Sequence, residues 1–340
     1  MTPRSSVEPS HAMMDVQDEL ARRVGPFVKR SPIMISPTLE QLPAPPAGAA
    51  GWPWTDAPPP LPELAPDGRR WPRISIVTPS FNQGAFVETA LRSIILQGYP
   101  NLEVIVVDGG STDGTVEVIA RYERWLKRWV SEPDGGPAEA LNKGFKQATG
   151  EILGFLNADD FYLPGGLAKV ACEFRMYPSA DVVSGNGYLA TSSGQLGVPI
   201  FSDRWNHRRF EYGTCVFVQQ ATLFRRRAFE QAGGFNERMR TCWDMQLWSD
   251  LARSGATFHG FEGFVAAFRL HGESITGSPA MRAQRTQDTR TIIEKFRGRR
   301  EARRDHLLQW LHRVRKFCHH PRRTLNQRAF LYSTLKRWSM

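Results

Sequence analysis

Short β-branched runs alternate with segments of helical periodicity from Arg73 onward, and this alternation limits the fold more than any other feature. The runs that we predict as buried strands are residues 74–78, 103–107, 129–131 and 152–156. Apolar residues recur at helical spacing over residues 86–95, 115–128 and 137–148. Strands that are separated by helices form a mostly parallel sheet with helices on both faces. We therefore predict an α/β fold whose ligands bind at the carboxyl ends of the strands.

Each of these four strands is followed by a small cluster of polar residues. The clusters are Thr78-Pro79-Ser80-Phe81-Asn82, Asp108-Gly109-Gly110-Ser111-Thr112-Asp113-Gly114, Glu132-Pro133-Asp134-Gly135-Gly136 and Asn157-Ala158-Asp159-Asp160. Taken alone, the second cluster fits a turn that caps the next helix through Asp113 or Ser111, and the fourth fits a helix start. Parallel strands bring all four to one edge, where carboxylates can bond a base or ribose and glycines let the backbone approach. Their combination favours a nucleotide site.

Proline dominates the first 72 residues, which hold 15 of the 24 prolines. Because proline fixes φ and lacks an amide donor, we predict a linker or wrapping arm over 1–72, with a short helix near 13–23. The second half of the chain is less regular. Its predicted strands are 181–185, 214–219 and 257–269, and its predicted helices are 226–232, 244–254 and the chain after 279.

The formal charge of +10 is concentrated at the end of the chain. Residues 281–340 contain 17 Lys and Arg against 4 Asp and Glu, a net of +13 that leaves −3 for the rest. Arginine alternates there with apolar and aromatic residues, which predicts basic amphipathic helices. An anionic membrane surface, nucleic acid and simple packing on the domain are the alternatives for this segment. Aromatic residues among the arginines favour a membrane over nucleic acid.

Several classes of protein are disfavoured. No stretch approaches the roughly 20 uncharged apolar residues of a membrane-spanning helix, which argues against an integral membrane protein. The N-terminus lacks the apolar core of a secretory signal. The four cysteines are Cys172, Cys215, Cys242 and Cys318. Because they are dispersed and form no CxxC pair, we expect no structural zinc site and a reduced, cytosolic setting.

The chain resembles the family 2 glycosyltransferases over residues 73–278. The segments that carry the resemblance are 74–82, 104–114, 134–144 and 150–165, which are specific only in combination. The resemblance implies a GT-A fold, which is Rossmann-like, with a nucleotide-sugar half at 73–165 and an acceptor half at 166–278. Residues 1–72 would then form a Pro-rich arm, and 279–340 a basic helical tail.

The resemblance also implies a donor site at the strand ends. The residues implied to bind the nucleotide sugar are Pro79, Ser80, Asn82, Asp108, Asp134, Lys143, Asn157 and Asp159. Asp108 would contact the base, because it ends the second strand as the family's aspartate does. Asn157-Ala158-Asp159 occupies the family's Asp-x-Asp metal motif, with asparagine in place of the first aspartate.

A divalent metal is the implied cofactor. Asp159, Asp160 and His271 are its implied ligands, and the ion would be Mg²⁺ or Mn²⁺. Such an ion stabilises the negative charge that a diphosphate leaving group develops. His271 stands in Arg269-Leu270-His271, directly after the last predicted strand, and a structural hydrogen bond is the alternative role for it.

The acceptor half resembles the family around Trp243-Asp244-Met245-Gln246-Leu247-Trp248, where the family's aspartate is the catalytic base. Asp244 would accept the proton of the acceptor hydroxyl, and a Trp-rich, partly dry surface would raise its pKa. A helix N-cap is the alternative role, and the two are compatible. Gln220 is implied either to touch substrate or to cap a helix.

The resemblance implies an inverting glycosyltransferase that moves one sugar from a nucleotide diphosphate sugar to an acceptor hydroxyl. The setting would be cell-surface polysaccharide or glycolipid assembly in the cytoplasm, with peripheral association at the inner face of the cell membrane. Its partners would be the donor, a glycan or lipid-linked acceptor and an anionic membrane surface, while nucleic acid is disfavoured. The alternative is a catalytically degenerate nucleotide-sugar-binding scaffold, which Asn157 supports and the intact Asp108, Asp159, Asp160 and Asp244 oppose.

Overall fold

The first half of the chain forms four parallel strands. The computed structural model describes residues 36–272, 274–276 and 278–319. Its first four strands are β1 (Ile74–Ser80), β2 (Leu102–Asp108), β3 (Arg128–Ser131) and β4 (Ile152–Phe155). They pair in the order β3-β2-β1-β4, and every pair is parallel. All four strands predicted from the alternation are therefore confirmed.

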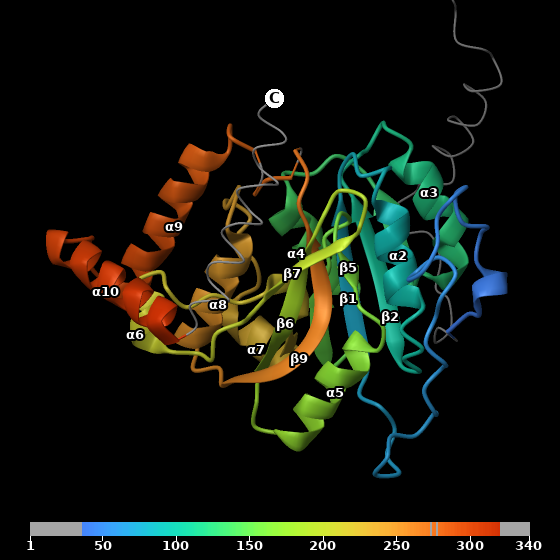
Figure 1. Cartoon of the computed structure of the whole chain (residues 1–340), viewed down its shortest axis with the longest axis horizontal. Helices are drawn as coiled ribbons and strands as arrows, with labels where there is room; N and C mark the ends of the chain where they lie inside the picture. The colour runs from blue at the N-terminus through green and yellow to red at the C-terminus, as the bar shows by residue number, and fades with distance from the viewer. Residues whose placement is uncertain (1–35, 273, 277, 320–340) are drawn as a thin grey trace, which may run out of the picture.

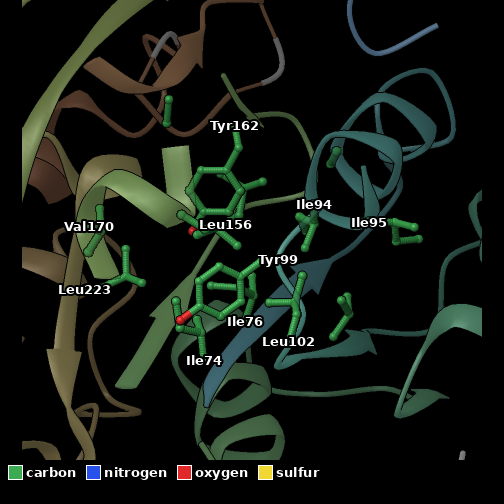
Figure 2. Packing of buried hydrophobic residues seen from close by; sticks show 14 of the residues in the cluster. Ile74, Ile76, Ile94, Ile95, Tyr99, Leu102, Leu156, Tyr162, Val170 and Leu223 are labelled. Atoms are coloured by element: carbon green, nitrogen blue, oxygen red, sulfur yellow. The ribbon is translucent and has the colours of Figure 1, made fainter. Parts of the chain in front are cut away.

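Helices cover both faces of these strands. The helices are α2 (Val87–Ile95), α3 (Thr115–Tyr122) and α4 (Pro137–Gln147), and a 3₁₀ turn, η2 (Glu123–Trp125), follows α3. Ile74 and Ile76 of β1 pack in one core with α2 and α3, whereas Val77 packs in a second core with α4. Successive strand residues point to opposite faces, so packing on both faces of the sheet explains why β1, β2 and β4 are buried along almost their whole length. Figure 2 shows Ile74 and Ile76 packed close to Tyr99 in the first core.

The second half extends the same sheet with antiparallel pairs. Its elements are β5 (Phe161–Tyr162), α5 (Gly166–Met176), β6 (Val182–Ala190), β7 (Leu196–Ile200), α6 (His207–Glu211), η3 (Gln219–Ala221), β8 (Thr222–Arg225), α7 (Arg226–Ala232), α8 (Trp243–Arg253) and β9 (Phe258–Arg269). The strand order continues from β4 as β8-β6-β9-β5, and β7 pairs with β6. β6 and β9 are parallel, and the other pairs of this half are antiparallel. The sheet runs through the middle of the molecule in Figure 1.

The predicted strand over residues 214–219 is wrong. The backbone there passes into η3, and the strand begins only at Thr222. The amide of Val216 donates to the Asp203 carboxylate (2.9 Å), and the amide of Val218 donates to the Ser202 hydroxyl (2.8 Å). Side chains from a preceding segment thus replace the ladder that a strand would need.

Residues 36–72 pack against α2 and the adjoining loops. The fully buried Arg92 donates hydrogen bonds to the carbonyls of Pro43, Pro53 and Trp54, at 2.9 to 3.1 Å. The Trp52 indole donates to the carbonyl of Tyr162 at 2.7 Å. A 3₁₀ turn, η1 (Leu39–Gln41), is the one helical element of this segment in the described part of the chain. The helix predicted near 13–23 lies outside the described residues.

Two basic helices end the described chain, as predicted for the region after residue 279. They are α9 (Arg282–Arg297) and α10 (Arg303–His319). Three side chains of α9 are buried: Ile292 and Phe296 belong to the second core, and Ile293 is buried as well. Both helices lie at the side of the molecule away from α2 and α3 (Figure 1). No helix between residues 36 and 319 is long and apolar enough to span a membrane.

Candidate active site

The polar clusters that follow the first strands meet at one edge of the sheet. Ser80 of β1 pairs with Asp108 of β2, which pairs in turn with Ser131 of β3. The amide of Gly109 donates to the carbonyl of Ser80 at 2.8 Å. On the other side of β1, the amide of Ala158 donates to the carbonyl of Pro79 at 3.3 Å. The register therefore places the predicted donor residues of β1, β2 and β4 side by side.

Asp108 organises the loop that follows its own strand. Its Oδ2 accepts hydrogen bonds from the amides of Gly110 (3.1 Å) and Ser111 (2.9 Å) and from the hydroxyl of Ser131 (2.7 Å). Its Oδ1 accepts from the Ser111 hydroxyl at 2.6 Å, and the residue has no exposed surface. A carboxylate has about four acceptor positions, and these are nearly used up. These bonds form a turn, but the helix cap predicted through Asp113 or Ser111 is wrong, because Gly114 is the N-cap of α3. The contact of Asp108 with a base stays a prediction.

The loops after β1 and β2 are bonded to one another. Asn82 adopts a left-handed conformation, with φ of 51°. Its amide donates to the Ser111 hydroxyl (2.7 Å), and its own Oδ1 accepts from the amide of Thr112 (3.0 Å). Asp113 accepts from the amides of Gly84 (2.9 Å) and Thr115 (3.1 Å). Asn82 therefore shapes this loop pair.

Gly109 keeps the site open between an acidic and an aromatic side chain. A Cβ at this position would lie 3.3 Å from both carboxylate oxygens of Asp134 and from Cδ2 of Phe81. The Phe81 ring is 60% exposed, and the sequence reasoning did not select it as a site residue. Burial raises the pKa of Asp134, although the Gly136 amide and the Lys143 charge act against this shift.

Lys143 is already paired with two carboxylates. Its ammonium lies 3.1 Å from Glu132 and 3.0 Å from Glu139. It is close enough to Asp134 to affect that carboxyl electrostatically. Lys143 is predicted to lie beside a nucleotide. In that role its ammonium would interact with the nucleotide while it is also paired with Glu132 and Glu139.

Asp159 and His271 form a close pair although 112 positions separate them in the sequence. Oδ2 of Asp159 lies 3.0 Å from Nε2 of His271, which is 4% exposed. The imidazole also packs against the Phe86 ring, with centroids 4.5 Å apart. Pairing of Phe161 in β5 with Ala267 in β9 brings the two together. The prediction that Asp159 and His271 meet at one site is consistent with this geometry.

Asp160 points into the protein. It is fully buried, and it accepts hydrogen bonds from the Gln220 amide group (2.8 Å) and the backbone amide of Arg269 (2.9 Å). Burial and the neighbouring Asp159 carboxylate raise the pKa of Asp160 well above its usual range. The Asp160 carboxylate therefore links the end of β9 to η3. Gln220, which was predicted to touch substrate or to cap a helix, bonds Asp160 instead.

Arg269 also lies at this site, although it is not among the site residues predicted from the sequence. Its Nε donates to the backbone carbonyl of Asp159 at 2.8 Å. Its guanidinium carbon lies 4.9 Å from the ring centre of Phe86 and 5.3 Å from that of Phe161. The only available signal was its position two residues before His271.

Among the described residues, several buried polar atoms at this edge have no hydrogen-bond partner. They include Oγ1 of Thr78, Oγ of Ser80, Oε1 of Gln83, Oδ1 of Asn157 and Nη2 of Arg269. Asn157 is otherwise held by weak contacts of its Nδ2 with Asp160 (3.5 Å) and Gln219 (3.4 Å). Because buried polar groups are almost always paired, unpaired atoms at a strand-end cluster indicate a place for a polar ligand.

Asp244 lies in the first turn of α8. Cys242, with φ of 55°, is the N-cap, so Asp244 is inside the helix rather than at the cap position that the alternative assigned to it. Burial raises the pKa of Asp244, and the amides of Met245 and of Asp244 itself offset this only in part. In the described chain, no hydrogen bond or ion pair joins its carboxylate to the strand-end groups.

The segment before α8 is tied to the loop after β3. The guanidinium of Arg240 donates to the carbonyl of Gly135. Asn142 of α4 accepts from the amide of Phe235 (3.0 Å) and donates to its carbonyl (2.9 Å). These bonds bring the start of α8, and Asp244 with it, toward the same edge of the sheet.

Of the three predicted metal ligands, Asp160 has both oxygens hydrogen-bonded inside the protein, so a metal would have two side-chain ligands here, Asp159 and His271. Within the described ranges, no group of three or more His, Cys, Asp or Glu side chains is arranged to hold a metal ion. The 3.0 Å between Asp159 and His271 nevertheless fits two neighbouring ligands, since octahedral ligands about 2.1 Å from Mg²⁺ are about 3 Å apart. Magnesium commonly takes one or two protein ligands and completes its shell with substrate phosphates and water.

The chain matches known proteins by sequence. Residues 75–233 match the family model described as Glycosyl transferase family 2. TuaG of Bacillus subtilis, named for teichuronic acid biosynthesis, is 31% identical over 234 residues, which cover 66% of this chain and 90% of TuaG. A PGL/p-HBAD biosynthesis glycosyltransferase of Mycobacterium tuberculosis is 32% identical over 182 residues, which cover 52% of this chain and 69% of that protein.

Solved structures share the fold at low sequence identity. The mannosyltransferase PcManGT from Pyrobaculum calidifontis, in complex with GDP-Man and Mn²⁺, has a TM-score of 0.53 and 23% identity over 76% of this chain and 73% of its own. Residues 1–349 of S. aureus TarS, in complex with UDP-GlcNAc, have a TM-score of 0.53 and 19% identity over 69% of both chains. The chain spans 43% of another TarS structure.

These likenesses confirm the predicted GT-A fold, an α/β fold with a largely parallel nucleotide half. They also confirm that the protein is an enzyme of the glycosyltransferase class. Because the match with TuaG covers nine-tenths of that relative at 31% identity, the chain belongs to glycosyl transferase family 2.

Proposed function

We propose that this glycosyltransferase moves a single sugar from a nucleotide diphosphate sugar to an acceptor hydroxyl, with inversion at the anomeric carbon. The observation that carries the proposal is the Asp159–His271 pair, 3.0 Å apart, at the edge where the strand-end loops converge. The unpaired polar atoms of Ser80, Asn157 and Arg269 support it, because a ligand could pair them. TarS with UDP-GlcNAc and PcManGT with GDP-Man are proteins of the same fold that bind such donors.

Asp159 and His271 are the residues that we propose to hold a Mg²⁺ or Mn²⁺ ion. Bound there, the ion would supply positive charge to the departing diphosphate. Asp160 would lie next to the metal site without binding the ion, because its oxygens accept hydrogen bonds from Gln220 and Arg269. The positive guanidinium of Arg269, with its unpaired Nη2, would add a fixed charge at the same place.

Asp244 is the base in this proposal. The acceptor oxygen forms the new bond to the anomeric carbon while the bond from that carbon to the diphosphate oxygen breaks. The acceptor proton passes to the Asp244 carboxylate, and the diphosphate leaves with the electron pair. A carboxyl whose pKa is raised by burial is a better proton acceptor than an exposed aspartate. Attack from the face opposite the leaving group produces inversion.

The acceptor that we propose is a glycan or a lipid-linked glycan of a cell-surface polysaccharide or glycolipid. The names of TuaG and of the mycobacterial relative, which refer to teichuronic acid and PGL/p-HBAD biosynthesis, support this setting. A lipid-linked acceptor would place the protein at the inner face of the cell membrane as a peripheral protein.

Calorimetric titration with UDP-, GDP- and dTDP-sugars, each with and without Mn²⁺, tests the donor site. We expect one nucleotide class to bind, with affinity that depends on the metal and falls at least tenfold in Asp159→Asn, roughly the cost of losing one charged ligand. Glu117→Gln, on the exposed side of α3, is the control and should bind as the wild type. A folded protein that binds none of these donors would contradict the proposal.

The scaffold alternative keeps one supporting observation, the asparagine at position 157. It predicts donor binding without release of the nucleotide diphosphate. Metal-dependent release in the presence of an acceptor, with product anomers assigned by NMR, separates the two functions and tests inversion at the same time.

A further inference from the structure

An apolar stripe runs along the outer side of α10. Leu307, Trp310, Leu311 and Val314 are 59, 58, 46 and 37% exposed. They recur at intervals of three and four residues, so they share one face of the helix. Four large apolar side chains in one stripe are more than an isolated exposed residue, and a contiguous stripe of this kind is typical of an interaction surface.

The opposite side of α10 is fixed to the rest of the protein. Asp305 is fully buried and accepts hydrogen bonds from Arg297 (3.1 Å) and Arg299 (2.6 and 2.8 Å). The His312 ring stacks on Tyr212, with centroids 5.4 Å apart. The apolar stripe therefore cannot turn inward without breaking these contacts, and Figure 1 shows α10 at the outside of the molecule.

Positive charge flanks the stripe and is not neutralised. Arg303, Arg304, Arg313 and Arg315 are exposed on α10, and within the described chain none of them forms an ion pair. The four acids of residues 281–340 are all engaged elsewhere: Asp288 and Asp305 are buried, and Glu294 and Glu301 pair with Arg290. The surface around the stripe thus carries arginines and no free carboxylate.

We propose that α10 lies in the surface of an anionic lipid membrane, with Leu307, Trp310, Leu311 and Val314 inserted among the lipids. An in-plane amphipathic helix combines an apolar face with flanking arginines that attract acidic headgroups, and tryptophan is favoured at this depth. Nucleic acid fits less well, because its phosphates would have to cover the apolar stripe. A second copy fits less well too, because two such faces would bring eight exposed arginines together.

Membrane binding by α10 rests on the proposed function in one respect: it would bring the active site to a lipid-linked acceptor. Vesicle binding needs no donor, metal or turnover. Failure of vesicle binding would therefore leave the donor chemistry untouched, and failure of donor binding would leave this surface untouched.

Co-sedimentation of the full chain with phosphatidylcholine vesicles, with and without phosphatidylglycerol, tests the proposal. We expect binding to the anionic vesicles, weakened at least about tenfold in Trp310→Glu/Leu311→Glu because both side chains would enter the interface. Arg313→Gln/Arg315→Gln should weaken it by a similar factor, since each basic residue contributes about 1 kcal/mol near an anionic surface. The matched control is Met176→Glu/Leu196→Glu, two apolar residues that are 62 and 45% exposed on α5 and β7, and it should bind as the wild type.

Several results would overturn the proposal. One is a wild-type chain that ignores anionic vesicles. Another is equal binding by the wild type and Trp310→Glu/Leu311→Glu, which would move any membrane contact to another segment. A third is a wild-type dimer that the same double variant dissociates, which would make a second copy the occupant. Retention of an oligonucleotide through Trp310 and Leu311 would likewise replace lipid by nucleic acid.

Discussion

Asp288 of α9 accepts two hydrogen bonds from Thr241, one from its amide (3.1 Å) and one from its hydroxyl (2.6 Å). Thr241 directly precedes Cys242, the left-handed N-cap of α8. The Cys242 sulfur also lies 3.5 Å from the hydroxyl of Thr289, again on α9. The basic helix α9 therefore fixes the start of the helix that carries Asp244, and it would set the position of the proposed base.

Asp288→Ala should lower kcat about tenfold while the KM for the donor changes little, because it would displace Asp244 without touching the strand-end loops. Asp288→Asn keeps an acceptor oxygen for Thr241 and should retain most of the activity. Steady-state kinetics at saturating acceptor measures both values. Asp250→Ala, which removes another α8–α9 contact, the 3.3 Å ion pair with Lys295, is the control. Equal losses in Asp288→Ala and Asp250→Ala would show that the cap has no special role.

The pH dependence of kcat/KM should report Asp244. Because burial raises its pKa above the ordinary value of 3.8, activity should fall on the acid side at a higher pH than a solvent-exposed aspartate would give. Asp244→Asn should lower kcat at least about 100-fold and remove this limb.

The stability of the Asp244 variant gives an independent check. A raised folded pKa means that Asp244 costs the folded protein stability as pH rises through the unfolded and then the folded pKa. Asp244→Asn removes this cost, so its free energy of unfolding at neutral pH should equal or exceed that of the wild type in denaturant titrations. A clearly less stable variant would assign Asp244 a structural role instead.

Gly109→Ala should weaken donor binding about tenfold without unfolding the protein. The new methyl would lie 3.3 Å from Asp134 and Phe81 and narrow the space between them, while the backbone at 109 is not left-handed. Gly260→Ala, whose Cβ would meet only ordinary contacts of 3.7 Å or more at the amino end of β9, is the control. Calorimetry of both variants compares the affinities, and unchanged binding by Gly109→Ala would place the donor elsewhere.

Arg92→Met should destabilise the protein by about 3 kcal/mol or more. The change leaves the carbonyls of Pro43, Pro53 and Trp54 without their donor inside the protein, and each such loss costs about 1 to 3 kcal/mol. Arg121→Met, which removes the more exposed ion pair with Glu88, should cost less than about 1 kcal/mol. Chemical denaturation measures both, and similar small losses would mean that the segment before β1 contributes little.

The parallel half of the fold was predictable because its strands and helices are each marked by the composition of their own residues. Residues 74–78 and 103–107 are rich in Ile and Val without a strict polar–apolar alternation, a pattern that is typical of strands buried on both faces. Residues 214–219 have a similar composition but form no strand. The Asp203 carboxylate and the Ser202 hydroxyl, which lie 13 and 16 positions before their partners, accept hydrogen bonds from the amides of Val216 and Val218. From the sequence alone, Arg92 would be expected on the exposed side of its helix. It is buried because the segment around Pro43, 49 positions earlier, covers it.

The candidate site was predictable in composition but not in orientation. Asp159 and Asp160 are adjacent and chemically identical in the sequence, and nothing local decides which one faces the open edge. The pairing of β5 with β9 decides it, because it brings the amide of Arg269 to Asp160 and His271 to Asp159. Asp108 was predicted to contact the base, whereas three hydrogen bonds from its own loop and one from Ser131 of β3 occupy most of its carboxylate.

The rate of nucleotide diphosphate release with and without Mn²⁺, in the wild type and in Asp159→Asn, tests whether the Asp159–His271 pair holds a catalytic metal. We expect metal-dependent release by the wild type, at least about 100-fold slower in Asp159→Asn, because the leaving group would lose its metal-borne charge. Glu117→Gln should release nucleotide diphosphate as the wild type does. Release that is equally fast in Asp159→Asn, or independent of added metal and of chelator, would contradict the assignment of the Asp159–His271 pair.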